Sequence, residues 1–206
     1  MSESSPLDRL DPALTASTRW LRDIAAPFML IGGVATGLLS QVRATKDVDW
    51  LASIPEDKLA FALAAAEKYG IVSKVSGILD FVQTSCVFPL VHQPSGGRVD
   101  VALAGSSFEE DAIRNAHPYF YKGLSVPLPR PEDLVVMKAI ANRPQDHADI
   151  ANIIRFNSGL DLRYVRRWVN EFADLMENLD IAEALEHTLK PRSMKMNIKK
   201  KPVKKK

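Results

Sequence analysis

Cysteine is nearly absent from this sequence: Cys86 is the single one among 206 residues. One cysteine cannot form an internal disulfide, so we expect a protein of the reducing cytoplasm, with Cys86 as a small buried side chain in an apolar stretch. No stretch approaches the ~18 consecutive apolar residues that a membrane-spanning helix requires. Residues 1–6 lack the basic start and apolar run of a secretory signal. These absences predict a cytoplasmic protein without membrane association.

Acidic residues are missing from the end of the sequence, residues 195–206, which contain seven lysines. Without these lysines the net charge of +2 becomes −5, so the rest of the chain is mildly acidic. Runs of like charge repel one another and are typical of disordered segments. We therefore predict a basic, disordered tail over residues 191–206. Two interpretations of this tail stay open: a solvated end that aids solubility, and a segment that contacts RNA or DNA.

Apolar runs and turn residues predict alternating strands and helices in the first 130 residues. Short apolar or β-branched runs indicate strands, and proline or acidic residues before an apolar face indicate helix starts. Strands are expected over Phe28–Ile31, Lys46–Ala52, Phe81–Val91, Arg98–Leu103 and Leu124–Leu128. Helices are expected over residues 10–26, directly after Gly33, and over residues 55–66 and 107–116.

Residues from Pro131 onward predict helices alone, over 131–141, 145–156, 161–175 and 181–189. A mixed first part followed by helices indicates the α/β (α+β) class. We expect a small mixed β-sheet core flanked by helices over residues 1–130. A helical C-terminal region would then cover residues 131–190.

Gly32 and Gly33 separate the first predicted strand from the helix that follows it. Glycine lets a backbone approach a phosphate closely, and a helix start presents unpaired N–H groups to it. The same pair also suits an ordinary tight turn between a strand and a helix. Taken alone, the two glycines leave both interpretations open.

Three aspartates on predicted strands are candidates for metal binding. Asp47 and Asp49 are two residues apart, so their side chains lie on the same face of a strand. Two carboxylates this close repel each other unless a cation such as Mg²⁺ lies between them, although such pairs also occur on solvent-facing strands. Asp100 lies between two valines, where a charge needs Arg98 or a metal as its partner. As a third carboxylate it would complete a two-metal site or act as a base toward an attacking hydroxyl.

The joint pattern is more specific than its parts. Ile31-Gly32-Gly33 followed by the run from Arg43 to Asp49 (Arg-x-Thr-x-Asp-x-Asp) resembles the signature of the nucleotidyltransferase superfamily, which has the polymerase β-like fold. Its relatives include minimal nucleotidyltransferases, antibiotic-modifying adenylyltransferases and the type IV toxin (abortive-infection) nucleotidyltransferases. Residues 134–150 are similar to the lysine-containing helix and the Arg–Asp–Asp segment of the toxin-like branch. The resemblance covers about residues 28–155.

This resemblance implies a reaction and a set of site residues. A nucleoside monophosphate would pass from a nucleoside triphosphate such as ATP to an acceptor hydroxyl, with release of pyrophosphate. Gly32 and Gly33 would face the triphosphate, Asp47 and Asp49 would bind Mg²⁺, and Asp100 would be the third catalytic carboxylate.

Further nucleotide contacts are expected from Thr36, Arg43 and Lys138. Many family members carry serine or threonine after the glycines, where this sequence has Val34. The phosphate contact would then have to come from backbone N–H groups or from Thr36. Arg43 would contact phosphate or pair with one of the aspartates. Lys138 would contact the triphosphate or extend to solvent along its helix. Asp146 and Asp149 share a helix face with Arg143 nearby; we favour structural pairing there over a carboxylate beside the nucleotide.

The acceptor is not determined by these residues. A tRNA end, a protein hydroxyl and a small molecule such as an aminoglycoside all fit the reaction. The toxin-like segment favours a macromolecular acceptor in a toxin–antitoxin or defence setting, with an antitoxin as partner. The alternative is a nucleotidyltransferase-like protein that binds a nucleotide or a partner protein without turnover, and Val34 is the feature in its favour.

Overall fold

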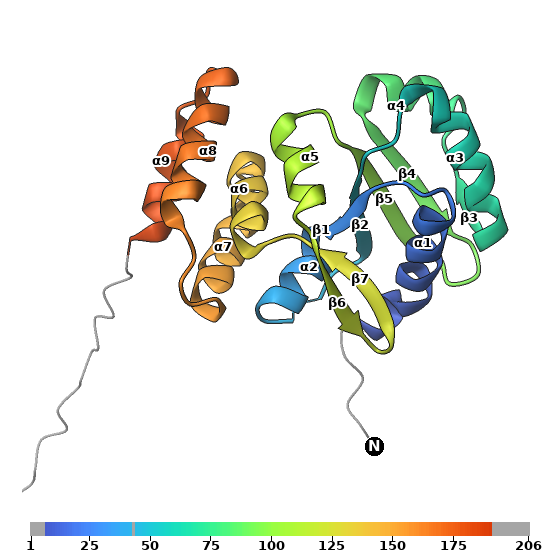
Figure 1. Cartoon of the computed structure of the whole chain (residues 1–206), viewed down its shortest axis with the longest axis horizontal. Helices are drawn as coiled ribbons and strands as arrows, with labels where there is room; N and C mark the ends of the chain where they lie inside the picture. Colours follow the sequence, from blue (N-terminus) through green and yellow to red (C-terminus); the bar gives the residue numbers. More distant parts are fainter. Residues whose placement is uncertain (1–6, 43, 191–206) are drawn as a thin grey trace, which may run out of the picture.

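The structure, a computed structural model, describes residues 7–42 and 44–190 and is built on a five-stranded mixed sheet (Figure 1). The strand order is β1-β2-β5-β4-β3, in which β2 and β5 are parallel and the other neighbours are antiparallel. The bounds are β1 (Phe28–Ile31), β2 (Asp47–Ala52), β3 (Ile71–Ser73), β4 (Val87–His92) and β5 (Gly97–Leu103). The expected mixed sheet with flanking helices is thereby confirmed.

Side-chain alternation along the strands gives the sheet two packed faces. Leu30 and Trp50 point into the main core, where α1 (Asp11–Asp23) and α3 (Leu59–Ala66) cover the sheet. Met29 and Leu51 point to the opposite face and pack against α5 (Ser107–Arg114), with Met137 at the edge of this second cluster. The active-site candidates Asp47 and Asp49 are four and two residues before Leu51 on the same strand, so their side chains lie on this second face.

Two buried indole N–H groups of the main core find partners within it. The Trp20 indole N–H donates to the Ala62 carbonyl at 2.8 Å, which ties α1 to α3. The Trp50 indole N–H donates to the Ser17 hydroxyl at 2.9 Å and ties the sheet to α1. These bonds satisfy groups that would otherwise be costly to bury.

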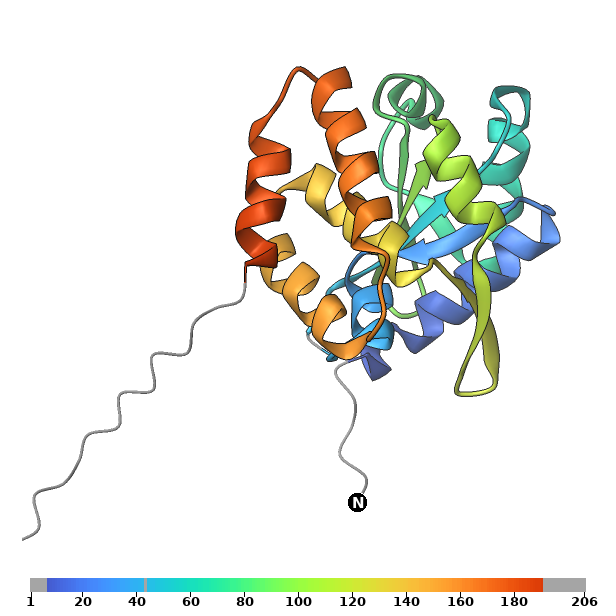
Figure 2. The same cartoon turned by 60° about the vertical axis from the view of Figure 1, so that its left-hand side comes forward.

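Helices alone follow Pro131, as expected. They are α6 (Pro131–Ala141), α7 (Pro144–Phe156), α8 (Leu162–Leu175) and α9 (Asp180–Leu189), and they lie together at one end of the molecule (Figures 1 and 2). Asn142 ends α6 with φ of 47°, in the left-handed conformation that asparagine tolerates. The Asp161 carboxylate caps α8 by accepting from the N–H groups of Arg163 and Tyr164. The boundary near residue 130 between a core and a separate helical region stays a prediction.

The expected strand over residues 81–91 was wrong in its first half. Helix α4 (Ile78–Ser85) occupies that part, and β4 begins only at Val87. Ile78 and Val82 face the core while Phe81 is exposed, which is a helical spacing that the dense apolar run concealed. Cys86, expected to be buried, is exposed and adopts φ of 55° where α4 ends.

Two strands were not expected from the sequence. The short β3 lies at the edge of the sheet beside β4. Strand β6 (His117–Tyr121) pairs with β7 (Leu124–Leu128) in a separate hairpin (Figure 2). The side chains of β6 are almost all exposed, so this strand carries no alternating pattern of burial.

The remaining elements are the helix α2 (Gly32–Leu39) and 3₁₀ turns at Asp8–Leu10, Glu56–Lys58 and Glu67–Tyr69. Among the residues that the structure describes, no helix is both long and apolar enough to span a membrane. The predicted tail over residues 191–206 and the candidate Arg43 lie outside the described residues.

Candidate active site

The three candidate carboxylates come together across β2 and β5. In the register of these parallel strands, Asp47 lies opposite Arg98 and Asp49 lies opposite Asp100. One carboxylate oxygen from each of Asp47, Asp49 and Asp100 lies within 4.8 Å of the other two. Two residues on one strand face and one on the adjacent strand therefore form a single acidic cluster.

Burial and mutual repulsion disfavour the charged form of two of these acids. The pKa of Asp49 is raised to about 6, first by burial and then by the neighbouring charge of Asp47. The pKa of Asp100 is also raised, again chiefly by burial. Oxygen ligands at this spacing are a donor set that suits a hard divalent cation such as Mg²⁺, which would relieve the repulsion.

Gly32 and Gly33 bring the start of α2 against this cluster. Gly32 has φ of 65°, and a Cβ atom there would lie 2.0 Å from Oδ2 of Asp49. The Gly33 N–H donates to the same oxygen at 3.4 Å, and a Cβ atom on Gly33 would lie 2.5 Å from Oγ1 of Thr45. The two glycines are thus required by the close approach of Asp49 and Thr45, whatever else binds there.

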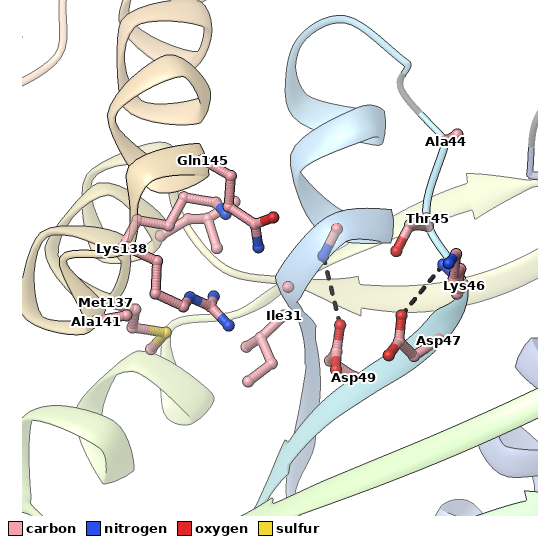
Figure 3. Close-up of a pocket in the computed structure, with 14 residues that line it drawn as sticks. Ile31, Ala44, Thr45, Lys46, Asp47, Asp49, Met137, Lys138, Ala141 and Gln145 are labelled. Atoms are coloured by element: carbon pink, nitrogen blue, oxygen red, sulfur yellow. Dashed lines mark hydrogen bonds between the residues drawn. The ribbon is translucent and has the colours of Figure 1, made fainter.

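A cleft of about 530 Å³ opens beside the two glycines and the aspartates of β2. Its floor comes from β1, α2 and β2, and its far wall from α6 and the start of α7. Figure 3 shows Lys138 and Gln145 on one side, with Thr45, Lys46 and Asp47 on the other. The lining residues are Ile31, Gly32, Gly33, Ala44, Thr45, Lys46, Asp47, Asp49, Leu134, Met137, Lys138, Ala141, Arg143 and Gln145.

No protein-family model and no curated protein matches this sequence. Solved structures do match. An antigenic nucleotidyltransferase-like protein from Paracoccidioides brasiliensis has a TM-score of 0.52 and 19% identity, over 87% of this chain and 93% of that one. The antibiotic-resistance factor ANT(2″)-Ia has a TM-score of 0.56 and 16% identity, over 87% and 97%. The lincosamide antibiotic adenylyltransferase LnuA, bound to lincomycin, has a TM-score of 0.51 and 16% identity, over 70% and 96%.

The chain has a nucleotidyltransferase fold. At these identities the likeness establishes the fold alone, and it agrees with the superfamily that the sequence resembles. The toxin-like branch is not singled out by these structures. Within the nucleotidyltransferase fold, the acidic cluster and the glycine turn lie next to each other in space, although Gly33 and Asp47 are separated by 13 residues in the sequence.

Thr36, the expected hydroxyl donor to a phosphate, is not brought into the cleft. Its side chain is buried, and its hydroxyl donates to the Gly32 carbonyl at 2.7 Å. Val34 is buried as well. The hydroxyl that does line the cleft belongs to Thr45, which faces Gly33 from the loop before β2.

Lys138 lines the cleft but does not extend to solvent. Its ammonium group contacts Asp149 at 2.6 Å and Asp146 at 3.1 Å, and all three side chains are buried. Asp146 also accepts from the Arg143 guanidinium at 2.7 Å. Burial acts to raise the pKa of this carboxyl, but the bond from Arg143 and the charge of Lys138 together outweigh burial and lower it. The favoured structural pairing of Asp146 is confirmed, and it joins α6 to α7.

Arg143 and Thr45 are site residues to which the sequence reasoning gave no nucleotide role. Both line the cleft, and the exposed positive charge of Arg143 acts on Asp49, whose pKa it lowers slightly against the larger effects of burial. The signal for both was present, because Thr45 precedes the two aspartates and Arg143 begins the Arg–Asp–Asp segment. What could not be read from the sequence is that the two residues face the same space.

Proposed function

We propose that this protein is a metal-dependent nucleotidyltransferase that passes a nucleoside monophosphate from a nucleoside triphosphate to an acceptor hydroxyl and releases pyrophosphate. The observation that carries this proposal is the cluster of Asp47, Asp49 and Asp100 beside a glycine-lined cleft, in a nucleotidyltransferase fold. The three carboxylates would hold Mg²⁺. When bound, the cation supplies neutralisation of the negative charge on the phosphates.

Different residues of the cleft would make different contacts with the triphosphate. The start of α2, with the positive end of its helix dipole, faces the cleft and favours negative charge there. Lys46, from the loop before β2, and Arg143, at the start of α7, both line it and supply positive charge. Arg143 is oriented for this by its bond to the buried Asp146. Thr45 supplies a hydroxyl close to Gly33, in place of the serine or threonine that Val34 replaces.

Lys138 is better placed as a support than as a phosphate ligand. Its ammonium charge is balanced by two buried carboxylates, and a phosphate would have to compete with both. We therefore assign Lys138 to holding α6 and α7 in register, so that Arg143 reaches the cleft.

Asp100 is the candidate base for the acceptor hydroxyl. It lies on β5, on the side of Asp49 opposite to β1, while the cleft for the triphosphate opens toward β1 and α2. Its carboxylate has two oxygens, so one can face the cation while the other accepts a proton. An acceptor hydroxyl that approaches over β5 would give its proton to Asp100 as it attacks the α-phosphate.

Two kinds of acceptor have separate support. The resemblance of residues 134–150 to the toxin-like branch supports a tRNA end or a protein hydroxyl, in a toxin–antitoxin or defence setting with an antitoxin partner. The structural neighbours LnuA, bound to lincomycin, and ANT(2″)-Ia, in complex with adenylyl-2″-tobramycin, support a small-molecule acceptor. We retain the macromolecular acceptor as the first proposal and the antibiotic as the second.

A binding protein without turnover is the second candidate function. It is favoured by Val34 and by the inward-facing hydroxyl of Thr36, which leave α2 without a side-chain hydroxyl in the cleft. The Thr45 hydroxyl argues for the enzyme. The two functions differ in whether labelled nucleotide is transferred once the triphosphate has bound.

The test is calorimetric titration of MgATP, MgGTP, MgCTP and MgUTP into the wild type and into Asp47→Ala/Asp49→Ala. Asp57→Ala/Asp174→Ala is the matched control, because both of its acids are exposed and neither lines the cleft. We expect one triphosphate to bind the wild type and the control but not the site variant. Absence of binding to a folded wild type, for all four triphosphates, would refute the proposal.

The acceptor is then sought with the preferred α-³²P-labelled triphosphate. Total tRNA, a cell protein extract, an aminoglycoside and a lincosamide are supplied in separate reactions. Label on tRNA or protein supports the first proposal, and label on an antibiotic supports the second. Binding of the triphosphate without transfer to any of them favours the protein without turnover.

A further inference from the structure

Arg98 occupies one end of the acidic cluster. It lies directly opposite Asp47 in the register of β2 and β5, two residues before Asp100 on the same strand face. Its guanidinium contacts Oδ2 of Asp47. The Arg98 side chain is 59% exposed while that of Asp47 is 23% exposed, so the arginine is the more solvent-exposed partner of the pair.

Both oxygens of Asp47 are engaged in this arrangement. Oδ2 accepts from Arg98, and Oδ1 accepts from the Lys46 backbone N–H at 3.1 Å. A divalent cation held by Asp47 needs one of these oxygens as a ligand. Since the Lys46 N–H is part of the backbone and the Arg98 side chain is long and exposed, Arg98 is the partner that can leave.

The positive charge of Arg98 also opposes a cation directly. Arg98 and a divalent ion at the cluster would both approach the same carboxylate, so each disfavours the other. The Arg98 guanidinium bonds to Asp47, and to neither of the other two acids of the cluster. Arg98 therefore compensates the charge of Asp47, while the carboxylates of Asp49 and Asp100 still favour the binding of a cation.

We propose that Arg98 is a positioning residue that acts through Asp47, holding this carboxylate in place until a divalent cation displaces the guanidinium. Arg98 thus sets the cation concentration at which the cluster fills. This inference rests on the proposed function, because it requires that the cluster binds a cation. It adds to that function a residue that is neither a metal ligand nor part of the triphosphate cleft.

The test measures Mn²⁺ binding without any nucleotide, by the loss of the free-ion signal in electron paramagnetic resonance. The variants are Arg98→Gln, Arg98→Lys and Arg114→Gln. Arg114→Gln is the matched control, because Arg114 forms an exposed ion pair with Asp111 on α5 and neither belongs to the cluster nor lines the cleft. Thermal unfolding in EDTA shows that each variant is folded.

Arg98→Gln is expected to bind Mn²⁺ roughly fivefold more tightly than the wild type. The cation then no longer has to break an exposed ion pair, and a nearby positive charge that repels it is gone. Arg98→Lys keeps the charge and should return the affinity toward that of the wild type. Arg114→Gln should leave it unchanged. An arginine that only stabilised the strand pair would change the melting temperature and not the Mn²⁺ affinity.

The outcomes separate this inference from the function on which it rests. Suppose that the wild type binds both Mn²⁺ and a triphosphate. Equal or weaker Mn²⁺ binding by Arg98→Gln then overturns the role of Arg98 alone. A wild type and an Arg98→Gln variant that bind neither Mn²⁺ nor any triphosphate overturn the role of Arg98 and the proposed function together.

Discussion

Asp49 and Asp100 lie opposite each other on β2 and β5, which are the parallel neighbours within the described part of the sheet. Asp49 also faces Ile31 on β1, the residue before the glycine turn. A single residue thus touches the turn on one side and the third carboxylate on the other. Any change that shifts Asp49 should therefore affect both the triphosphate cleft and the acidic cluster.

The first prediction concerns the pH dependence of stability without a divalent cation. The pKa of Asp49 is about 6 in the folded chain, above its ordinary value of 3.8, so the folded state binds this proton more tightly than the unfolded state. The free energy of unfolding should then fall as the pH rises from about 4 to about 6 and stay level above it. The contribution of Asp49 is about 1–3 kcal/mol.

Urea unfolding in EDTA, for the wild type and Asp49→Asn, isolates this contribution from those of the other acids. The free energy of unfolding of the wild type should fall relative to that of Asp49→Asn as the pH rises to about 6. Saturating Mg²⁺ should restore the stability of the wild type at neutral pH, because a cation stabilises the ionised carboxylate. A difference that stays flat between pH 4 and pH 7 would contradict the prediction.

The second prediction concerns Gly32→Ala. A methyl group at Gly32 would collide with the Asp49 carboxylate, and alanine disfavours the φ of 65°. We expect a loss of about 2–3 kcal/mol in stability and the loss of triphosphate binding. Gly96→Ala is the matched control, since Gly96 has φ of 69° and no heavy atom within 4 Å of the added methyl group. It should cost about 1 kcal/mol and leave binding intact; equal effects of the two variants would count against the role of Gly32.

Local patterns were enough to predict the central part of the site. The alternation of Asp47 and Asp49 on a strand, and the glycines between a strand and a helix, depend on neighbours in the sequence. A place for Asp100 beside this pair of aspartates was one of the interpretations that its residues left open, and the family resemblance implied it. Nothing in the spacing of residues 49 and 100 specifies that β2 and β5 are neighbours in the sheet.

Contacts between distant residues were the part that sequence reasoning missed. Arg98 was named as a partner for Asp100, its neighbour in the chain, but the strand register places it against Asp47. Lys138 was expected to reach solvent or phosphate, yet two acids of the next helix neutralise it. The error at Cys86 has a different cause. The same apolar run can form a helix or a strand, and these two structures direct a given side chain toward different surroundings.

The third prediction follows from that error. The Cys86 thiol is exposed in the folded protein, so a disulfide reagent such as dithionitrobenzoate should modify it at a rate within about tenfold of that in 6 M urea. One equivalent should react, since Cys86 is the single cysteine, and Cys86→Ser should give no signal. Modification that occurs only after unfolding would restore the original expectation of a buried residue.

The fourth prediction concerns Lys138→Met, which removes a positive charge from between two buried carboxylates. Methionine fills a similar volume, so the main cost is electrostatic: Asp146 and Asp149 lose the ammonium group that contacts both of them. We expect a loss of about 3–5 kcal/mol in the free energy of unfolding at pH 7. Arg166→Met is the comparison, because it breaks an exposed pair with Glu186 and should cost less than about 1 kcal/mol. If Lys138→Met were as mild as Arg166→Met, the lysine would not be a structural support, and a direct contact with the triphosphate would again be the better role for it.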